Sequence, residues 1–176
     1  MKGIVLYRSK YGAAKQYAAW LEEATGFDCA EVRNAGIEAL KRYDVIILAG
    51  GIYASGISVI PFLRKHIDEL GKKKIAVFCV GASPFDEDAF AQVRAHNFKG
   101  TLQGIPCFYG RGAWDESAMS LTDRTLCRML QQMVAKKDPA SLEPWEKALM
   151  CAAGQACDWT DRAFLQPLLD WIEEVR

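Results

Sequence analysis

The chain has 176 residues, of which 51% are apolar and 25% are charged, an ordinary composition for a globular protein. This length fits one domain with a hydrophobic core that needs no disulfide or metal to hold it together. Lys plus Arg equal Asp plus Glu at 22 each, so the basic surplus that is typical of a nucleic-acid-binding protein is absent.

Four apolar runs predict the strands of a buried parallel sheet. They are short, rich in β-branched or aromatic residues, and continuous rather than alternating, as expected for strands covered on both faces. In chain order they are Gly3–Tyr7, Val45–Ala49, Ile75–Val80 and Ile105–Tyr109. A fifth run, Asp28–Val32, alternates with polar residues and is typical of an edge strand.

Helical patterns separate these strands. Apolar residues recur at i, i+3, i+4 and i+7 after Gly12, a second apolar stripe of helical spacing runs over Ile60–Leu70, and a third helix is predicted to begin near Asp86. The alternation predicts an α/β fold, a doubly wound five-stranded parallel sheet with right-handed crossovers and strand order 2-1-3-4-5.

The stretch from Arg111 to Gln155 is too long for a simple connection between a strand and a helix. It carries a helical stripe, a break at Asp138-Pro139, and a second short helical pattern over Glu143–Ala153. We interpret residues 111–155 as a helical insertion before the last helix of a single domain spanning residues 1–176. We expect the apolar stripe to pack onto that domain. The stripe consists of Leu126, Met129, Leu130, Met133 and Val134.

The last helix is predicted over Thr160–Val175, with Thr160 or Asp158 as its cap. Pro167 falls inside this segment and predicts either a kink or a later helix start.

Neither a membrane-spanning segment nor a cysteine motif typical of a redox or metal site is found in this sequence. No stretch of about 18 apolar residues is present for a membrane span, and the first residues lack the layout of a signal peptide. None of the six cysteines forms a C-x-x-C pair, and no His, Cys or Asp cluster has the spacing of a metal site. We therefore expect a cytoplasmic protein with reduced cysteines and no bound metal.

In an open parallel sheet, ligands bind at the carboxyl ends of the strands, where the strand order reverses. For order 2-1-3-4-5 this point lies between the first and third strands, so the loops that follow these strands and the fourth are the candidate site.

The first loop leads from a strand directly into a helix, where free backbone N–H groups and the helix dipole favour an anion. Its glycine permits close approach and its serine adds a hydroxyl, so it predicts a phosphate cradle without a cationic side chain. A plain turn in which Ser9 caps the helix is the alternative. The loop consists of Ser9, Lys10, Tyr11, Gly12, Ala13 and Ala14.

The second loop follows the glycine pair Gly50-Gly51 and suits a flat ring lying against the backbone. Tyr53 either stacks on that ring or is a half-buried loop aromatic. The residues expected to bind are Gly51, Ile52, Tyr53, Ala54, Ser55 and Gly56.

The third loop, 81–88, opens with the small residues Gly81, Ala82 and Ser83, which again permit close approach to a ligand. The acidic run Asp86–Asp88 either begins a helix, where its charge favours the dipole, or adds negative charge beside the ligand.

Three other classes of phosphate-handling protein are excluded by these loops. The sequence has no G-x-x-x-x-G-K-[ST] and no G-x-G-x-x-G after the first strand, so it lacks both the P-loop and the dinucleotide fingerprint. A phospho-acceptor receiver domain needs carboxylates at the ends of the first and third strands, where this chain has Tyr7-Arg8-Ser9 and Ala49-Gly50-Gly51.

Taken together, the three loops resemble the flavodoxin family, most closely its branch around menaquinone-dependent protoporphyrinogen dehydrogenase. The family's phosphate loop reads [ST]-x-x-G-x-T, which Ser9 and Gly12 match while Ala14 replaces the closing Thr. Its second loop resembles a glycine followed closely by I-Y-A, matched from Gly50 to Ala54. The branch also has a glycine turn, an inserted helix and a D-W element, here Gly110-Arg111-Gly112 and Asp158-Trp159.

This resemblance implies noncovalent FMN, with its phosphate on the first loop and its ring between the second and third loops. The cofactor would carry the redox chemistry, so no catalytic side chain is expected. His66 and His96 are both expected to lie on helices away from these loops.

Three functions remain open at this level. The first is an electron carrier that serves a redox partner protein. The second is an FMN-dependent oxidoreductase of the protoporphyrinogen dehydrogenase type, or a quinone reductase, with a small-molecule electron donor or acceptor. The third is an interaction module that has lost flavin. The insertion favours the first two, because an insertion near the flavin can shape a substrate or partner site.

Overall fold

Five parallel strands form the centre of the molecule, and the computed structural model describes all 176 residues. Their order is β2-β1-β3-β5-β6, which confirms the predicted order of the five parallel strands. A two-residue strand, β4 (Gly56–Ile57), pairs antiparallel with the end of β3. The parallel strands are β1 (Gly3–Arg8), β2 (Asp28–Glu31), β3 (Val45–Tyr53), β5 (Lys74–Gly81) and β6 (Cys107–Arg111).

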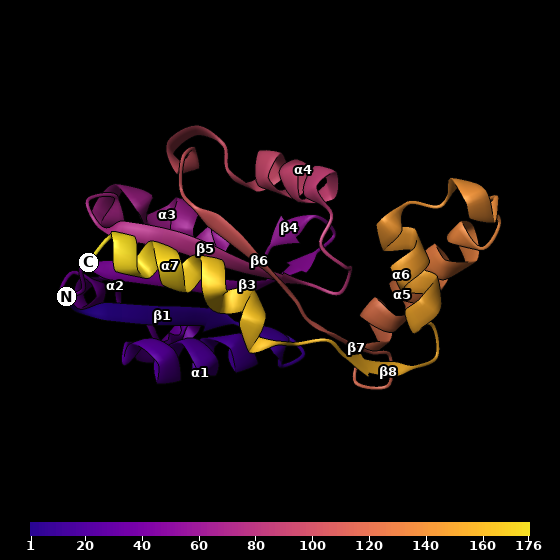
Figure 1. The fold of residues 1–176 in the computed structure, drawn as a ribbon, viewed down its shortest axis with the longest axis horizontal. Coiled ribbons are helices and arrows are strands. Elements are labelled where there is room, and N and C mark those ends of the chain that lie inside the picture. The colour runs from indigo at the N-terminus through magenta and orange to yellow at the C-terminus, as the bar shows by residue number, and fades with distance from the viewer.

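Helices cover both faces of this sheet (Figure 1). On one face, α1 (Ala13–Thr25) and α7 (Gln166–Glu174) pack against alternate strand residues in one core cluster. On the other, α2 (Ile37–Leu40), α3 (Ile60–Leu70) and α4 (Glu87–Asn97) pack over a second cluster. Because both faces are covered, the strand segment Val45–Ala49 is completely buried, which explains its continuous apolar sequence.

The start of the last helix differs from its predicted position. Asp161, rather than Thr160 or Asp158, caps the segment, because its side chain accepts a hydrogen bond from the backbone N–H of Ala163 at 2.8 Å. A 3₁₀ turn over Arg162–Leu165 comes first, and α7 begins at Gln166 with Pro167 in its first turn. Pro167 therefore marks a later helix start and not a kink, since proline is well tolerated where no backbone donor is needed.

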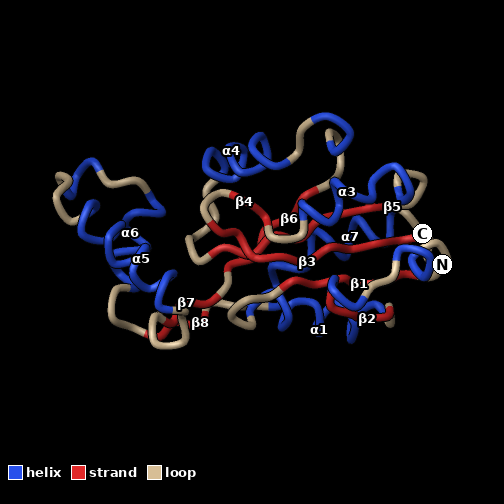
Figure 2. Tube along the Cα trace, turned by 180° about the vertical axis from the view of Figure 1, so that it is seen from behind, coloured by secondary structure: helices blue, strands red, loops and turns tan.

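The insertion forms an arm that extends past the carboxyl ends of the strands (Figures 1 and 2). Its base is an antiparallel ribbon of β7 (Ala113–Asp115) and β8 (Ala156–Asp158). The ribbon leads to α5 (Leu121–Val134) and α6 (Pro144–Ala152), which pack against each other and are joined through a 3₁₀ turn at Pro139–Ser141.

The prediction that the apolar stripe of α5 packs onto the sheet domain is wrong. Leu126, Met129 and Met133 are 60%, 56% and 64% exposed, Leu130 is 37% exposed, and Val134 alone is buried. The ribbon carries α5 beyond the end of the sheet, so α6 is the helix against which it packs. The remaining apolar face of α5 is left in solvent.

All six cysteines are free. Cys79 and Cys107 lie on neighbouring strands inside the core with their sulfurs 3.8 Å apart, and thiol hydrogen bonding together with burial raises the pKa of Cys79. This confirms their interpretation as small core residues. Among the helices, none combines the length and the apolar character that crossing a membrane requires.

Candidate functional site

The first loop is an arc of backbone donors at the positive end of α1. Ser9 Oγ accepts a hydrogen bond from the N–H of Gly12 at 3.0 Å, and Gly12, not Ser9, is the N-cap of the helix. Gly12 has a φ of +101°, which L-residues rarely adopt. Backbone N–H groups that make no hydrogen bond within the protein include those of Tyr11, Ala13 and Ala14. Such free donors beside a helix N-terminus can bind an anion.

The second loop is shorter than predicted, because β3 continues through Gly50 and Gly51 to Tyr53 and turns back at once into β4. The turn consists of Ala54 and Ser55, whose φ angles are +46° and +66°. Pairing between Ile52 and Ile57 extends β3, and no apolar pattern in the sequence predicted this extension.

Asn97, at the end of α4, holds this turn in place and was not predicted as a site residue. Its side chain is 4% exposed. Its Oδ1 accepts from the N–H of Ile57 at 2.9 Å, and its Nδ2 donates to the carbonyls of Ser55 and Val93 at 2.7 and 2.8 Å. Nothing local marks this role, since the two partner segments are about 40 residues apart in the chain.

Tyr53 packs against its own strand and the first loop. A Cβ on Gly51 would lie 2.7 Å from the Tyr53 hydroxyl, so the tyrosine covers that glycine. The ring centroids of Tyr53 and Tyr11 are 6.4 Å apart with the rings edge to face, and burial raises the pKa of Tyr53. With 40% exposure, Tyr53 has the geometry of a half-buried loop aromatic that joins the first and second loops.

The third loop is anchored from β6. The Tyr109 hydroxyl donates to the carbonyl of Ser83, and Arg111 Nε donates to the carbonyl of Ala82 at 3.1 Å. The Arg111 guanidinium lies 4.0 Å from the ring centroid of Trp159 and has no carboxylate partner. This loop therefore has a positive charge directly behind it.

The acidic run begins a helix, as one of the two interpretations predicted. Asp86 Oδ1 accepts from the N–H of Ala89 at 2.9 Å and caps α4, and Glu87 and Asp88 occupy the first turn. Asp86 and Asp88 also line the cleft described next, where their negative charge would lie beside a bound ligand.

A cleft of about 940 Å³ separates the second and third loops and α4 from the insertion. Its lining is mostly apolar, and the insertion contributes Trp114 and Trp145 to one wall while Phe85 and Phe90 lie on the other. Binding sites for small molecules commonly measure about 300–1,000 Å³, so this cleft has room for a flat ring and part of a second molecule. His96 lines it as well, which corrects the expectation that both histidines lie away from the site.

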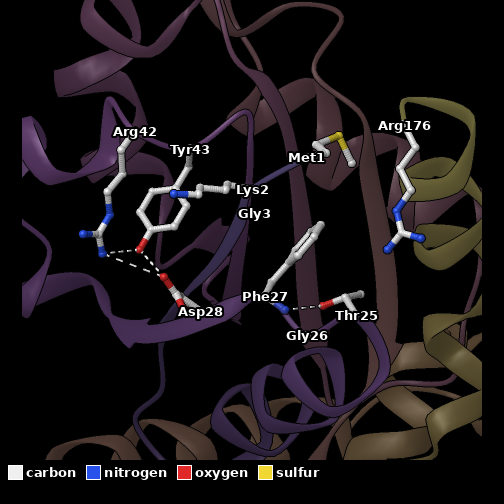
Figure 3. Close-up of a pocket in the computed structure, with 10 residues that line it drawn as sticks. All are labelled: Met1, Lys2, Gly3, Thr25, Gly26, Phe27, Asp28, Arg42, Tyr43 and Arg176. Carbon is white, nitrogen blue, oxygen red and sulfur yellow. Dashed lines mark hydrogen bonds and ion pairs between the residues drawn. The ribbon is translucent and has the colours of Figure 1, made fainter.

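A second hollow, of about 680 Å³, lies at the opposite end of the sheet (Figure 3). It is formed where β1 and β2 begin, and its lining includes Lys2, Phe27 and Arg42. Arg42 donates to the Tyr43 hydroxyl at 2.7 Å and lies 3.8 Å from the Asp28 carboxylate, so its charge is already engaged. None of the predicted cofactor residues lies there.

The structure brings the predicted residues together at one edge of the sheet. The first and second loops touch through Tyr11 and Tyr53, and residues of the second and third loops face the same cleft. No group of three or more His, Cys, Asp and Glu side chains is arranged to hold a metal ion.

The sequence matches the model of a protein family described as the flavodoxin domain over residues 4–141. No curated protein sequence matches the chain. Solved structures with a similar fold include the Trp repressor binding protein of Bacillus subtilis, at 16% identity and a TM-score of 0.48, covering 63% of this chain and 85% of that chain. The two-electron reduced flavodoxin of Megasphaera elsdenii is 20% identical with a TM-score of 0.45, covering 61% and 82%. A flavoprotein of Lactobacillus acidophilus in complex with FMN is 15% identical with a TM-score of 0.43, covering 62% and 91%.

Proposed function

This chain belongs to the flavodoxin domain family, and from that premise we propose that it binds one FMN at the carboxyl edge of its sheet and transfers electrons through it. The phosphate would lie on residues Ser9–Ala14. The flavin ring would lie between residues 51–56 and residues 81–83.

The observation that carries this proposal is the set of free backbone donors in the first loop. The N–H groups of Tyr11, Ala13 and Ala14 have no protein acceptor, and Gly12 adds no side chain that would block an anion. An anion of one phosphate group fits one such arc. The chain offers no second phosphate motif, so FMN fits better than FAD, whose pyrophosphate needs a longer binding surface.

The remaining loops supply a slot for a flat ring. Asn97 fixes the turn of the second loop, while Tyr109 and Arg111 fix the third loop from behind. Such supported loops are prepared for a ligand before it binds, which lowers the ordering cost of binding. When bound, FMN supplies the redox chemistry, and the protein holds the ring, excludes water and sets the local charge.

The cleft favours a second candidate function, that of an FMN-dependent oxidoreductase. A carrier that only exchanges electrons with a partner protein needs an accessible flavin edge, whereas this cleft of about 940 Å³ extends to the aromatic wall of the insertion. A small apolar molecule would fit there against Trp114 and Trp145. The reaction would be the oxidation of a protoporphyrinogen-like compound or the reduction of a quinone, since both substrates are small apolar molecules.

Flavin titration tests the shared part of the two functions. The purified protein should bind FMN at micromolar concentration or below, riboflavin less tightly, and FAD less tightly than FMN. Absence of FMN binding in equilibrium dialysis would refute the proposal.

A second measurement separates the two functions. The FMN-loaded protein is reduced and its reoxidation by quinones and by a flavodoxin-dependent partner protein is followed in the visible spectrum. Saturable reoxidation by a small molecule supports the enzyme, and reoxidation by the partner protein alone supports the carrier.

A further inference from the structure

We propose that Asp123, carried by the insertion, is a positioning residue for the phosphate-binding loop, so that the insertion is part of the cofactor site. This inference rests on the proposed function, because it concerns how the first loop meets the phosphate of FMN.

Asp123 lies in the first turn of α5 and contacts two residues of the first loop. The Lys10 ammonium and the Tyr11 hydroxyl both donate to Asp123 Oδ2. The Tyr11 hydroxyl also accepts a long hydrogen bond of 3.4 Å from the N–H of Ser120, the residue that caps α5. Two consecutive residues of the loop are therefore docked on the beginning of the insertion helix.

The charges of this contact are matched. The hydrogen bond between Lys10 and Asp123 raises the pKa of Lys10 and lowers the pKa of Asp123, so both groups are ionised near neutral pH. Lys10 Nζ also lies 5.5 and 5.9 Å from the ring centroids of Tyr11 and Tyr53. One cluster thus joins the first loop, the second loop and the insertion.

No other ion pair links the insertion to the sheet domain. The remaining ion pairs of the arm, Arg128–Glu116 and Lys137–Glu146, lie within it. The base of the arm is held by backbone contacts, such as the bond from the N–H of Trp159 to the carbonyl of Gly112 at 3.0 Å. Contact with the phosphate loop is therefore made by Asp123 and its neighbour Ser120, at the point where α5 begins.

Tyr11 carries one of the free backbone N–H donors of the loop, and Lys10 directly precedes it. Fixing the side chains of these residues restricts the backbone that carries the donors, so less conformational freedom remains to be lost when a phosphate binds. Asp123 also brings a negative charge near the phosphate, which by itself would oppose binding. The two effects have opposite signs, and this makes the inference testable.

The test compares FMN with riboflavin, which lacks the phosphate. In Asp123→Asn the affinity for FMN should fall by about fivefold, at the lower end of typical coupling between linked sites, while the affinity for riboflavin stays within a factor of about two. Asp138→Asn is the matched control, because Asp138 is an exposed carboxylate of the same arm that caps the 3₁₀ turn away from the loop. It should change neither affinity. Both constants come from quenching of flavin fluorescence.

A double-mutant cycle completes the test. Lys10→Met should weaken FMN binding to a similar extent, and combining it with Asp123→Asn should add little, because both changes remove one contact. Tighter or unchanged FMN binding in Asp123→Asn would overturn the inference, and so would equal losses for FMN and riboflavin. If the wild-type protein binds neither flavin, the proposed function itself fails; if it binds FMN and the variant behaves like the control, the inference alone fails.

Discussion

Replacing Gly12 with alanine places a Cβ on a residue whose φ is +101° and whose ψ is −34°. No atom lies within 4 Å of that Cβ, so the substitution causes no clash and its cost is backbone strain alone. A non-glycine residue in so sparsely populated a region costs about 1–3 kcal/mol. Because the new Cβ would contact nothing, we expect residue 12 alone to relax toward a favourable φ in the free protein, so that the strain appears when the phosphate binds.

Converted at about 1.4 kcal/mol per factor of ten, this strain weakens FMN binding by about 5- to 150-fold. The assay measures two quantities for each variant, the dissociation constant of FMN by fluorescence quenching and the free energy of unfolding of the free protein in urea. Gly26→Ala is the matched control, since Gly26 also has a positive φ, at +69°, with open space around its Cβ, but lies at the far end of α1. Its cost should be confined to the unfolding free energy.

The reasoning is refuted if Gly12→Ala binds FMN as tightly as the wild type does. In that case the positive φ of Gly12 would be dispensable, and the phosphate would have to lie elsewhere. A loss of equal size in Gly26→Ala would refute it too, because a general weakening of α1 would then explain the result.

Further outcomes follow from the same contacts. Ser9→Ala removes a hydroxyl from the loop, and losing a hydrogen bond to a charged phosphate should weaken FMN binding by about 1.5–3 kcal/mol with no change for riboflavin; equal losses for the two flavins would contradict this. Asn97→Leu leaves buried backbone groups of the second loop without partners and should lower the free energy of unfolding in urea by about 1–3 kcal/mol. Arg111→Gln removes an unpaired positive charge behind the third loop, so redox titration should give a lower potential for the bound flavin, by roughly tens of millivolts after solvent screening. Converting the acidic run 86–88 to amides should shift that potential upward, and a shift in the same direction for both variants would show that local charge is not the cause.

The parts of the fold that sequence patterns predicted are those governed by short-range rules. Continuous apolar runs located four of the five parallel strands, because strands covered on both faces need apolar side chains at every position, and a run that alternates with polar residues located the edge strand β2. The apolar stripe over Ile60–Leu70 coincides with α3, which has a proline in its first turn and a glycine directly after its end. Strand ends were less well predicted: β3 runs four residues beyond Val45–Ala49 because pairing with β4 extends it.

For the candidate site, glycine positions were the informative signal. Glycine pairs and small residues after buried strands pointed to all three loops, because close approach of a ligand to the backbone tolerates little else. The residues that support these loops were not predicted from the sequence. Asn97 and Asp123 carry no local signature, and each acts on a segment about 40 or more residues away in the chain.

The sequence by itself therefore determined the sheet and its strand order, since periodicity and chain connectivity leave few other arrangements, and it predicted the edge at which a ligand would bind. Only the tertiary structure decided where the insertion lies and what it contacts. An apolar stripe on a helix indicates that one face favours burial, but it does not indicate which surface will cover that face. In this protein the β7–β8 ribbon carries α5 past the end of the sheet, so Leu126 and Met129 stay exposed while Asp123, on the same helix, contacts Lys10 of the first loop.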